Sequence, residues 1–117
     1  MHELSLTQSL LDIVEDYARR EGFSRVNVLK LSFGSLSCID PGALEFAFDV
    51  QSRGTKAEGA RLEFDIRPAV LYCMDCKQES AAEGFQPLCP LCGNGDVLLA
   101  GGTEELKLLE MDVDEEE

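Results

Sequence analysis

Two Cys-x-x-Cys pairs in a chain of only 117 residues are the feature that most limits how this sequence can fold. The pairs, Cys73/Cys76 and Cys89/Cys92, are separated by 12 residues. Two turns of this kind can surround one tetrahedral ion with four thiolates, at metal–sulfur distances of about 2.3 Å. A module of about thirty residues cannot bury a stable core of its own and needs the ion in order to fold. We therefore predict a structural zinc ion, with no open coordination position, held by Cys73, Cys76, Cys89 and Cys92.

Iron is the main alternative to zinc, because a tetrahedron of sulfur ligands suits either metal. The sequence Cys-Pro-Leu-Cys-Gly at residues 89–93 resembles the second metal-binding turn of rubredoxins. A rubredoxin-like electron carrier, however, does not need two helices and a separate sheet. Only Tyr72 and Phe85 are aromatic in residues 69–101, too few to shield a redox centre. Zinc is therefore preferred, and the colour and metal content of the purified protein distinguish the two.

Outside the cysteine segment, hydrophobic periodicity predicts two helices and three strands. A first helix is expected over residues 5–21, with a capping box at Ser5 and a stop at Gly22. A second helix is expected to have Asp40 as its N-cap and Pro41 in its first turn, and to end at Gly54. The strands are expected at residues 25–36, 62–66 and 106–113, with a further short strand at 97–99.

These elements define an α+β fold class. Residues 1–68 and 102–117 are expected to form a small mixed α/β domain, with two helices on a three-stranded sheet. Residues 69–101 are expected to form an inserted four-cysteine zinc-ribbon domain. The tail from Asp112 to Glu117 holds five acids and one valine, so we expect it to fray. Cys38 is expected to be a small buried hydrophobe, as free cysteines commonly are.

The charge of the chain excludes several classes of partner. Ten basic side chains against 23 acidic ones give a formal net charge of −13, so nucleic acid is not an expected partner. No apolar run is long enough to span a bilayer, so no membrane role is expected. The start of the sequence lacks the pattern of a secretory signal, and reduced paired cysteines are typical of the cytoplasm, where we expect the protein to act.

His2, the only histidine, creates a second possible metal site at the N-terminus. A bulky residue at position 2 favours retention of Met1. The α-amine of Met1, the amide nitrogen of His2 and its imidazole can then form fused chelate rings. Such planar nitrogen donors favour Ni(II) or Cu(II) over tetrahedral zinc. Glu3 can complete the plane through its amide or its carboxylate.

The sequence Met-His-Glu-Leu-Ser at residues 1–5, followed by the two Cys-x-x-Cys pairs, resembles the HypA/HybF family of hydrogenase nickel-incorporation proteins. The resemblance covers essentially the whole chain. It implies that Met1, His2 and Glu3 carry nickel and that the four cysteines carry zinc. It also implies a small mixed α/β nickel domain with an inserted zinc domain. Some members recruit another histidine as the fourth nickel ligand, and since this chain has none, Glu3 or water takes that place.

The function implied by the resemblance is that of a nickel metallochaperone, not an enzyme, that delivers Ni(II) during maturation of nickel–iron hydrogenase. The implied partners are a maturation GTPase and the hydrogenase large-subunit precursor, and the expected assembly is a monomer or a weak homodimer. One histidine at position 2 leaves no Ser/His/Asp or Cys/His catalytic pair, and no Gly-x-x-x-x-Gly-Lys phosphate loop occurs. The alternatives are a zinc-ribbon interaction adaptor, in which His2 is incidental, and the rubredoxin-like carrier. Whether urease is also supplied stays open.

Overall fold

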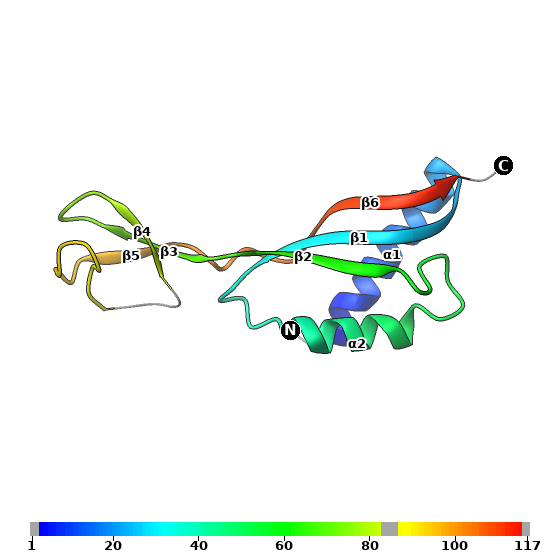
Figure 1. Ribbon diagram of the computed structural model, residues 1–117, viewed down its shortest axis with the longest axis horizontal. Coiled ribbons are helices and arrows are strands. Elements are labelled where there is room, and N and C mark those ends of the chain that lie inside the picture. Colours follow the sequence, from blue (N-terminus) through cyan, green and yellow to red (C-terminus); the bar gives the residue numbers. More distant parts are fainter. Residues whose placement is uncertain (1–2, 83–86, 116–117) are drawn as a thin grey trace. The chain divides into compact units, whose positions relative to one another are not determined.

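The computed structural model describes residues 3–82 and 87–115 (Figure 1). These residues form two helices and six strands, which make two three-stranded sheets of order β2-β1-β6 and β4-β3-β5. The elements are α1 (Glu3–Glu21), β1 (Phe23–Gly34), α2 (Pro41–Gln51), β2 (Arg61–Arg67), β3 (Ala69–Cys73), β4 (Glu79–Ala82), β5 (Val97–Gly101) and β6 (Lys107–Glu115). The predicted fold class is confirmed, because two helices accompany one three-stranded sheet and the cysteines accompany another.

The chain divides into two compact units. The first, the helical unit, lies within Met1–Leu31, Ile39–Asp65 and Lys107–Glu117. The second, the ribbon unit, comprises Ser32–Cys38 and Ile66–Leu106 and contains all four paired cysteines. No helix in the described residues is long and apolar enough to cross a bilayer.

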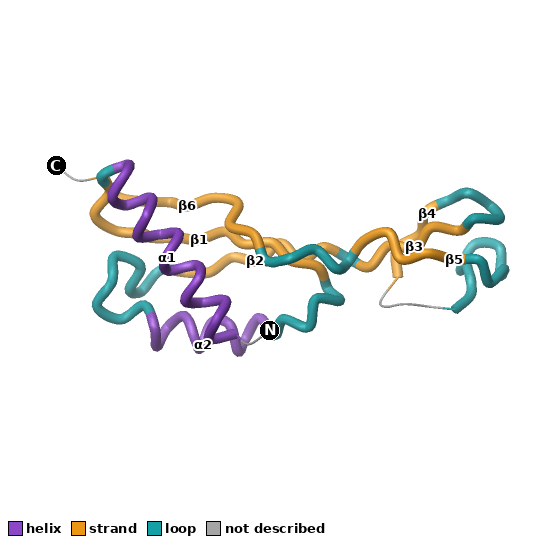
Figure 2. The backbone as a smooth tube through the Cα atoms, turned by 180° about the vertical axis from the view of Figure 1, so that it is seen from behind, coloured by secondary structure: helices purple, strands orange, loops and turns teal. Residues whose placement is uncertain are grey.

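The core of the helical unit lies between the helices and one face of the sheet. Figure 1 shows α1 behind the strands, and Figure 2, seen from the opposite side, shows it in front of them. Each helix buries an apolar stripe at helical spacing, and β1 buries one face against it. The buried apolar residues of the unit include Leu6, Leu10, Leu11, Val14 and Ala18 of α1, Phe23, Val26, Leu29 and Leu31 of β1, and Leu44, Ala47 and Phe48 of α2.

Helix α1 begins at Glu3, so the prediction that Ser5 caps it is wrong. Ser5 is exposed within the helix, one residue before the buried Leu6. An acidic side chain in the first turn interacts favourably with the positive N-terminal end of the helix dipole, and Glu3 occupies that place. The predicted end is confirmed, since the helix stops at Glu21 and the Gly22 N–H donates to Ala18 O at 3.0 Å.

Helix α2 starts as predicted and ends earlier than predicted. The Asp40 carboxylate accepts hydrogen bonds from the N–H groups of Gly42 (3.0 Å) and Ala43 (3.4 Å), as an N-cap does. The C-cap is Ser52, whose N–H donates to Phe48 O at 2.8 Å, so Gly54 lies beyond the helix.

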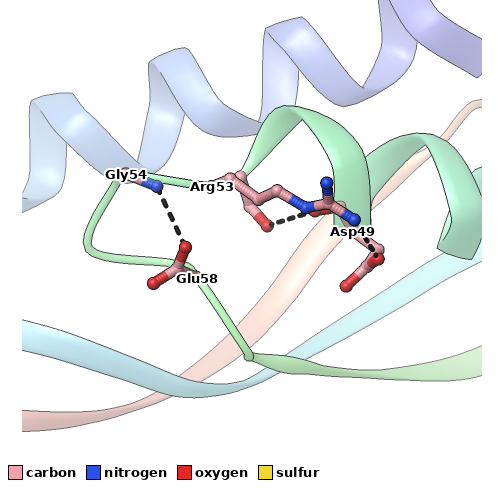
Figure 3. Close-up of polar contacts among 5 residues, drawn as sticks. Asp49, Arg53, Gly54 and Glu58 are labelled. Carbon is pink, nitrogen blue, oxygen red and sulfur yellow. Dashed lines mark hydrogen bonds and ion pairs between the residues drawn. The ribbon is translucent and has the colours of Figure 1, made fainter.

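Gly54 belongs to the turn after α2 (Figure 3). Its N–H donates to the Glu58 carboxylate at 3.2 Å, while Arg53 reaches back to Asp49 at 3.4 Å. This turn brings the chain from α2 to β2, beside β1 in the sheet.

The acidic C-terminal segment is more ordered than predicted. Strand β6 continues to Glu115, so the expectation of fraying from Asp112 is wrong for residues 112–115, and residues 116–117 lie outside the described part. Ser24 Oγ donates to Asp114 O at 3.1 Å, and Asn27 Nδ2 donates to the Asp114 carboxylate at 3.0 Å. Pairing with β1 in the sheet, together with these two side-chain hydrogen bonds, therefore holds a segment that has too few apolar side chains to order itself.

In the ribbon unit, β3 is the central strand and pairs antiparallel with both β4 and β5. The end of β1 and the residues after it are joined to the segment that follows β5 by two backbone hydrogen bonds. Gly34 N–H donates to Glu104 O at 2.9 Å, and Leu36 N–H donates to Gly102 O at 2.7 Å. The backbones approach so closely that a Cβ atom at Gly34 would lie 2.1 Å from Gly102 O, which explains the glycine.

Candidate metal centre

The first cysteine turn begins at Cys73, which is the last residue of β3, the central strand of the ribbon sheet. The Lys77 N–H donates to Cys73 O at 2.8 Å and closes the turn. Within it, the Cys76 N–H points to the Cys73 sulfur at 3.5 Å. This contact helps to fix the position of the Cys73 sulfur within the turn.

The second turn repeats this geometry before β5. The Gly93 N–H donates to Cys89 O at 2.8 Å, and the Leu91 N–H points to the Cys89 sulfur at 3.4 Å. Gly93, directly after the second pair, has a positive φ of 81°, a conformation that glycine adopts readily. Lys77, at the equivalent place in the first turn, has a φ of 58°, which sequence reasoning missed. Its only sequence signal is its position directly after a Cys-x-x-Cys pair.

The structure brings the four sulfur atoms together. Cys73 Sγ lies 3.6 Å from Cys92 Sγ, Cys76 Sγ lies 3.8 Å from Cys89 Sγ, and all four lie within 4.8 Å of one another. Ligands at about 2.3 Å from a tetrahedral ion are separated by about 3.8 Å, so these spacings suit one central ion. They are far longer than the disulfide bond length of about 2.05 Å, and all four cysteines are free.

The four thiols differ in burial, and together they form a complete set of ligands for a structural site. Cys73 and Cys89 are buried, Cys76 is half-buried and Cys92 is exposed. Four protein thiolates fill a tetrahedron and leave no position for water or substrate. Such a site holds two turns together and performs no catalysis.

The protein environment also makes the thiols unequal as acids. Backbone N–H groups, first that of Cys92 and then that of Leu91, lower the pKa of Cys89 to about 7. Burial, followed by the contact with Cys73, raises the pKa of Cys76 to about 12. Near neutral pH, Cys89 is therefore better prepared than Cys76 to bind a divalent ion as a thiolate.

The predicted nickel ligands fall at the limit of the described chain. Met1 and His2 lie outside the described residues, and Glu3 is the half-buried first residue of α1. The prediction that Cys38 is buried is wrong, because its side chain is exposed and its φ is 65°. Its backbone has a left-handed conformation. Cys38 follows a turn that the Ser37 N–H closes by donating to Gly34 O at 3.1 Å, and it precedes the Asp40 cap of α2. Its side chain lies on the surface.

The fold and the site together define a class of protein: a small mixed α/β chain that carries a four-cysteine ribbon suited to a structural zinc ion. The family model described as "Hydrogenase/urease nickel incorporation, metallochaperone, hypA" matches residues 1–113. The chain belongs to this HypA family. It is thus a maturation factor of the metallochaperone kind and not an enzyme.

Individual members of the family match this chain over nearly their full length. The chain is 57% identical to hydrogenase maturation factor HypA of Syntrophus aciditrophicus, over 97% of this chain and 100% of that protein. It is 46% identical to HypA of Cereibacter sphaeroides, over 97% and 99% of the two chains. Two solution structures share the fold: one of a HypA protein (TM-score 0.70, 23% identity, 99% and 98% coverage) and one of the nickel metallochaperone HypA from Helicobacter pylori (TM-score 0.66, 22% identity, 99% and 100% coverage).

Proposed function

We propose that this protein binds Ni(II) at its N-terminus and delivers it during maturation of nickel–iron hydrogenase. The observation that carries the proposal is the family match over residues 1–113, which begins at the Met-His-Glu segment. Helix α1, a rigid element, begins at the last residue of this segment, Glu3. A site at a helix start is anchored while its ligands remain reachable, which suits a metal that must be handed on.

The proposed nickel ligands are the α-amine of Met1, the amide and imidazole nitrogens of His2, and Glu3. Nitrogen donors in one plane match the geometry that Ni(II) prefers. Glu3 supplies the fourth ligand through its amide or its carboxylate, or water does so beside it. This donor set differs from the sulfur tetrahedron, so the two sites select different metals.

The resident metal in this proposal is zinc, held by Cys73, Cys76, Cys89 and Cys92. Sulfur spacings of 3.6 and 3.8 Å support a tetrahedral ion there. We assign residues 69–101 as the zinc-binding domain, and residues 1–68 and 102–117 as the nickel-binding domain. Zinc then supplies the stability that the small ribbon lacks.

The proposed partners are a hydrogenase maturation GTPase and the hydrogenase large-subunit precursor, with the protein acting as a monomer or weak homodimer. Nucleic acid is not a proposed partner, because the net charge is −13. We place the protein in the cytoplasm, where four thiols remain reduced and able to bind metal.

Nickel titration by calorimetry, with zinc measured in the same samples, tests the proposal. We expect His2→Ala to weaken nickel binding, and Glu21→Ala, an acid at the far end of α1, to leave it unchanged. Glu3→Ala should weaken nickel binding if the Glu3 carboxylate is the fourth ligand, and should leave it unchanged if the Glu3 amide or water is. One residue added before Met1 converts the amine into an amide and should weaken nickel binding as well. Zinc content should be the same in all of these proteins.

The same titration separates the alternatives. Unchanged nickel affinity in His2→Ala would favour a zinc-ribbon adaptor in which His2 has no role. Equal affinity with and without the added residue would remove the Met1 amine from the ligand set. A red protein that contains iron would replace the zinc assignment with a rubredoxin-like centre.

A further inference from the structure

The four-cysteine cluster is more accessible at one sulfur ligand than at the others. Cys92 is exposed, whereas Cys73 and Cys89 are buried and Cys76 is half-buried. Cysteines are oxidised according to their thiolate character and their access to solvent, and a cysteine that binds metal does so as a thiolate. An oxidant that arrives from solvent therefore meets the Cys92 thiolate first.

The closest sulfur contacts of Cys92 and Cys76 each reach across to the other turn. Cys92 Sγ lies 3.6 Å from Cys73 Sγ, and Cys76 Sγ lies 3.8 Å from Cys89 Sγ. The turns meet because β3 and β5 are antiparallel neighbours, so the end of β3 adjoins the start of β5 (Figure 1). Each of these two pairs therefore combines one cysteine from the turn after β3 with one from the turn before β5.

We propose that a hydroperoxide converts the cluster into two disulfide bonds, one between Cys73 and Cys92 and one between Cys76 and Cys89, which replace zinc as the link between the turns. This inference rests on the zinc assignment in the proposed function. It adds a modification site, Cys92, and a second state of the ribbon unit in which the link is covalent.

The chemistry can be written out for hydrogen peroxide. The Cys92 thiolate attacks one peroxide oxygen, the O–O bond breaks, hydroxide leaves and Cys92 becomes a sulfenic acid. The Cys73 thiolate then attacks the Cys92 sulfur, the S–O bond breaks and a second hydroxide leaves. Two electrons have passed from the cysteine pair to the peroxide. A second peroxide oxidises Cys76 and Cys89 in the same way, and the divalent ion, left without thiolate ligands, is released.

The pairing of the cysteines decides whether the ribbon unit stays folded without zinc. Disulfides that cross between the turns keep them joined, and the backbone bond from Met74 N–H to Asp96 O, at 2.9 Å, remains between the bases of the two turns. Disulfides within each Cys-x-x-Cys pair would leave the turns without a link, and so small a module would then unfold. The oxidised ribbon is therefore a folded state, and reduction of its disulfides restores the four thiols.

Oxidation of the full-length, zinc-loaded Cys38→Ser protein by hydrogen peroxide tests this inference. The substitution removes the other exposed cysteine, and the remaining four allow only three disulfide connectivities. Two equivalents of peroxide should release the zinc, as measured with a coloured chelator. Lys77 is the only basic residue between Cys73 and Cys92, so trypsin cuts the chain between the turns there. After digestion without reductant, the two cysteine peptides should remain joined, and their fragment spectra should show the proposed pairs.

A shorter oxidation tests the order of events. With one equivalent of peroxide, alkylation of the remaining thiols should label Cys76 and Cys89 and leave Cys73 and Cys92 unlabelled. In the fully oxidised protein, the amide resonances of β3 and β5 should stay dispersed, and dithiothreitol with added zinc should restore the starting spectrum.

Tryptic peptides that separate without reductant, a bond between Cys73 and Cys89, or retention of zinc after two equivalents of peroxide would overturn the inference. Collapse of the β3 and β5 resonances on oxidation would do so as well. Metal analysis before oxidation is read separately. Iron in the purified protein would reject the zinc assignment, while peptide mapping of the same oxidised protein would still test the pairing of the sulfurs.

Discussion

Replacement of Gly34 by alanine should destabilise the ribbon unit by several kilocalories per mole. The added Cβ would lie 2.1 Å from Gly102 O and 2.6 Å from Glu104 N, whereas real Cβ atoms essentially never approach within 3.0 Å. These neighbours are backbone atoms, so no side chain can rotate away. The two segments must separate by about 0.9 Å, the difference between 3.0 and 2.1 Å.

This separation would lengthen the two hydrogen bonds that join these segments, from Gly34 N–H to Glu104 O and from Leu36 N–H to Gly102 O. Each is worth about 1 kcal/mol, and forced overpacking adds about 1–3 kcal/mol. We therefore expect the free energy of unfolding to fall by about 3–5 kcal/mol. Because zinc binding is coupled to folding of the ribbon, the apparent zinc affinity should fall as well.

The two tyrosines allow this loss to be assigned to the correct unit. Tyr17 lies on α1 and Tyr72 on β3, so in a Tyr17→Phe background tyrosine fluorescence reports on the ribbon unit alone. Denaturant unfolding in that background measures the effect of Gly34→Ala, and competition with a coloured chelator measures zinc affinity. Gly42→Ala is the control, because its Cβ meets only the Asp40 carboxylate at 3.5 Å, and it should be neutral or stabilising. A change below about 1 kcal/mol in Gly34→Ala would refute the reasoning.

Three further predictions test the metal site and the fold. Cys92→Ser should release zinc and unfold the ribbon while the helical unit stays folded, whereas Cys38→Ser, at the other exposed cysteine, should keep its zinc; metal analysis and amide resonances check both. The ribbon should also lose stability as the pH is lowered, which denaturant unfolding of the zinc-loaded protein at a series of pH values measures. Because the folded pKa of Cys89 lies below its ordinary value of 9.0, its thiolate stabilises the fold fully above about pH 9, and this contribution is lost as the pH falls through about 7. Asp40→Ala should lower thermal stability by about 1 kcal/mol through loss of the α2 cap, and no change in melting temperature would contradict that role.

The features that sequence reasoning predicted correctly depend on residues close together in the chain. A Cys-x-x-Cys turn closes within five residues, so the spacing of Cys73, Cys76, Cys89 and Cys92 was sufficient to predict a four-sulfur cluster. The Asp40 cap is equally local, since its hydrogen bonds reach only two and three residues onward.

The features that were missed depend on contacts distant in sequence or on competing local signals. Gly34 and Gly102 are far apart in the sequence, and hydrophobic periodicity is evaluated separately for each segment. No residue near Gly34 therefore indicated that the two backbones approach closely. The order of residues 112–115 likewise comes from pairing with β1, through Ser24 and Asn27. At α1, the sequence around Ser5 resembles a helix N-cap, but the helix begins two residues earlier, at Glu3. The acidic side chain of Glu3 lies in the first turn of the helix.

The earlier start of α1 changes what the proposed nickel site requires. If the helix began at Ser5, Glu3 would lie in an irregular segment, and nickel binding would have to order it at an entropic cost. In the structure Glu3 already belongs to the helix, so this ligand is positioned before the metal arrives. The first N–H groups of a helix have no partner within it, so the Glu3 amide can bind a metal without breaking a helical hydrogen bond. The positive end of the helix dipole also favours loss of an amide proton nearby, which a planar nitrogen site requires. The helix start thus lowers the free-energy cost of assembling the proposed ligand set.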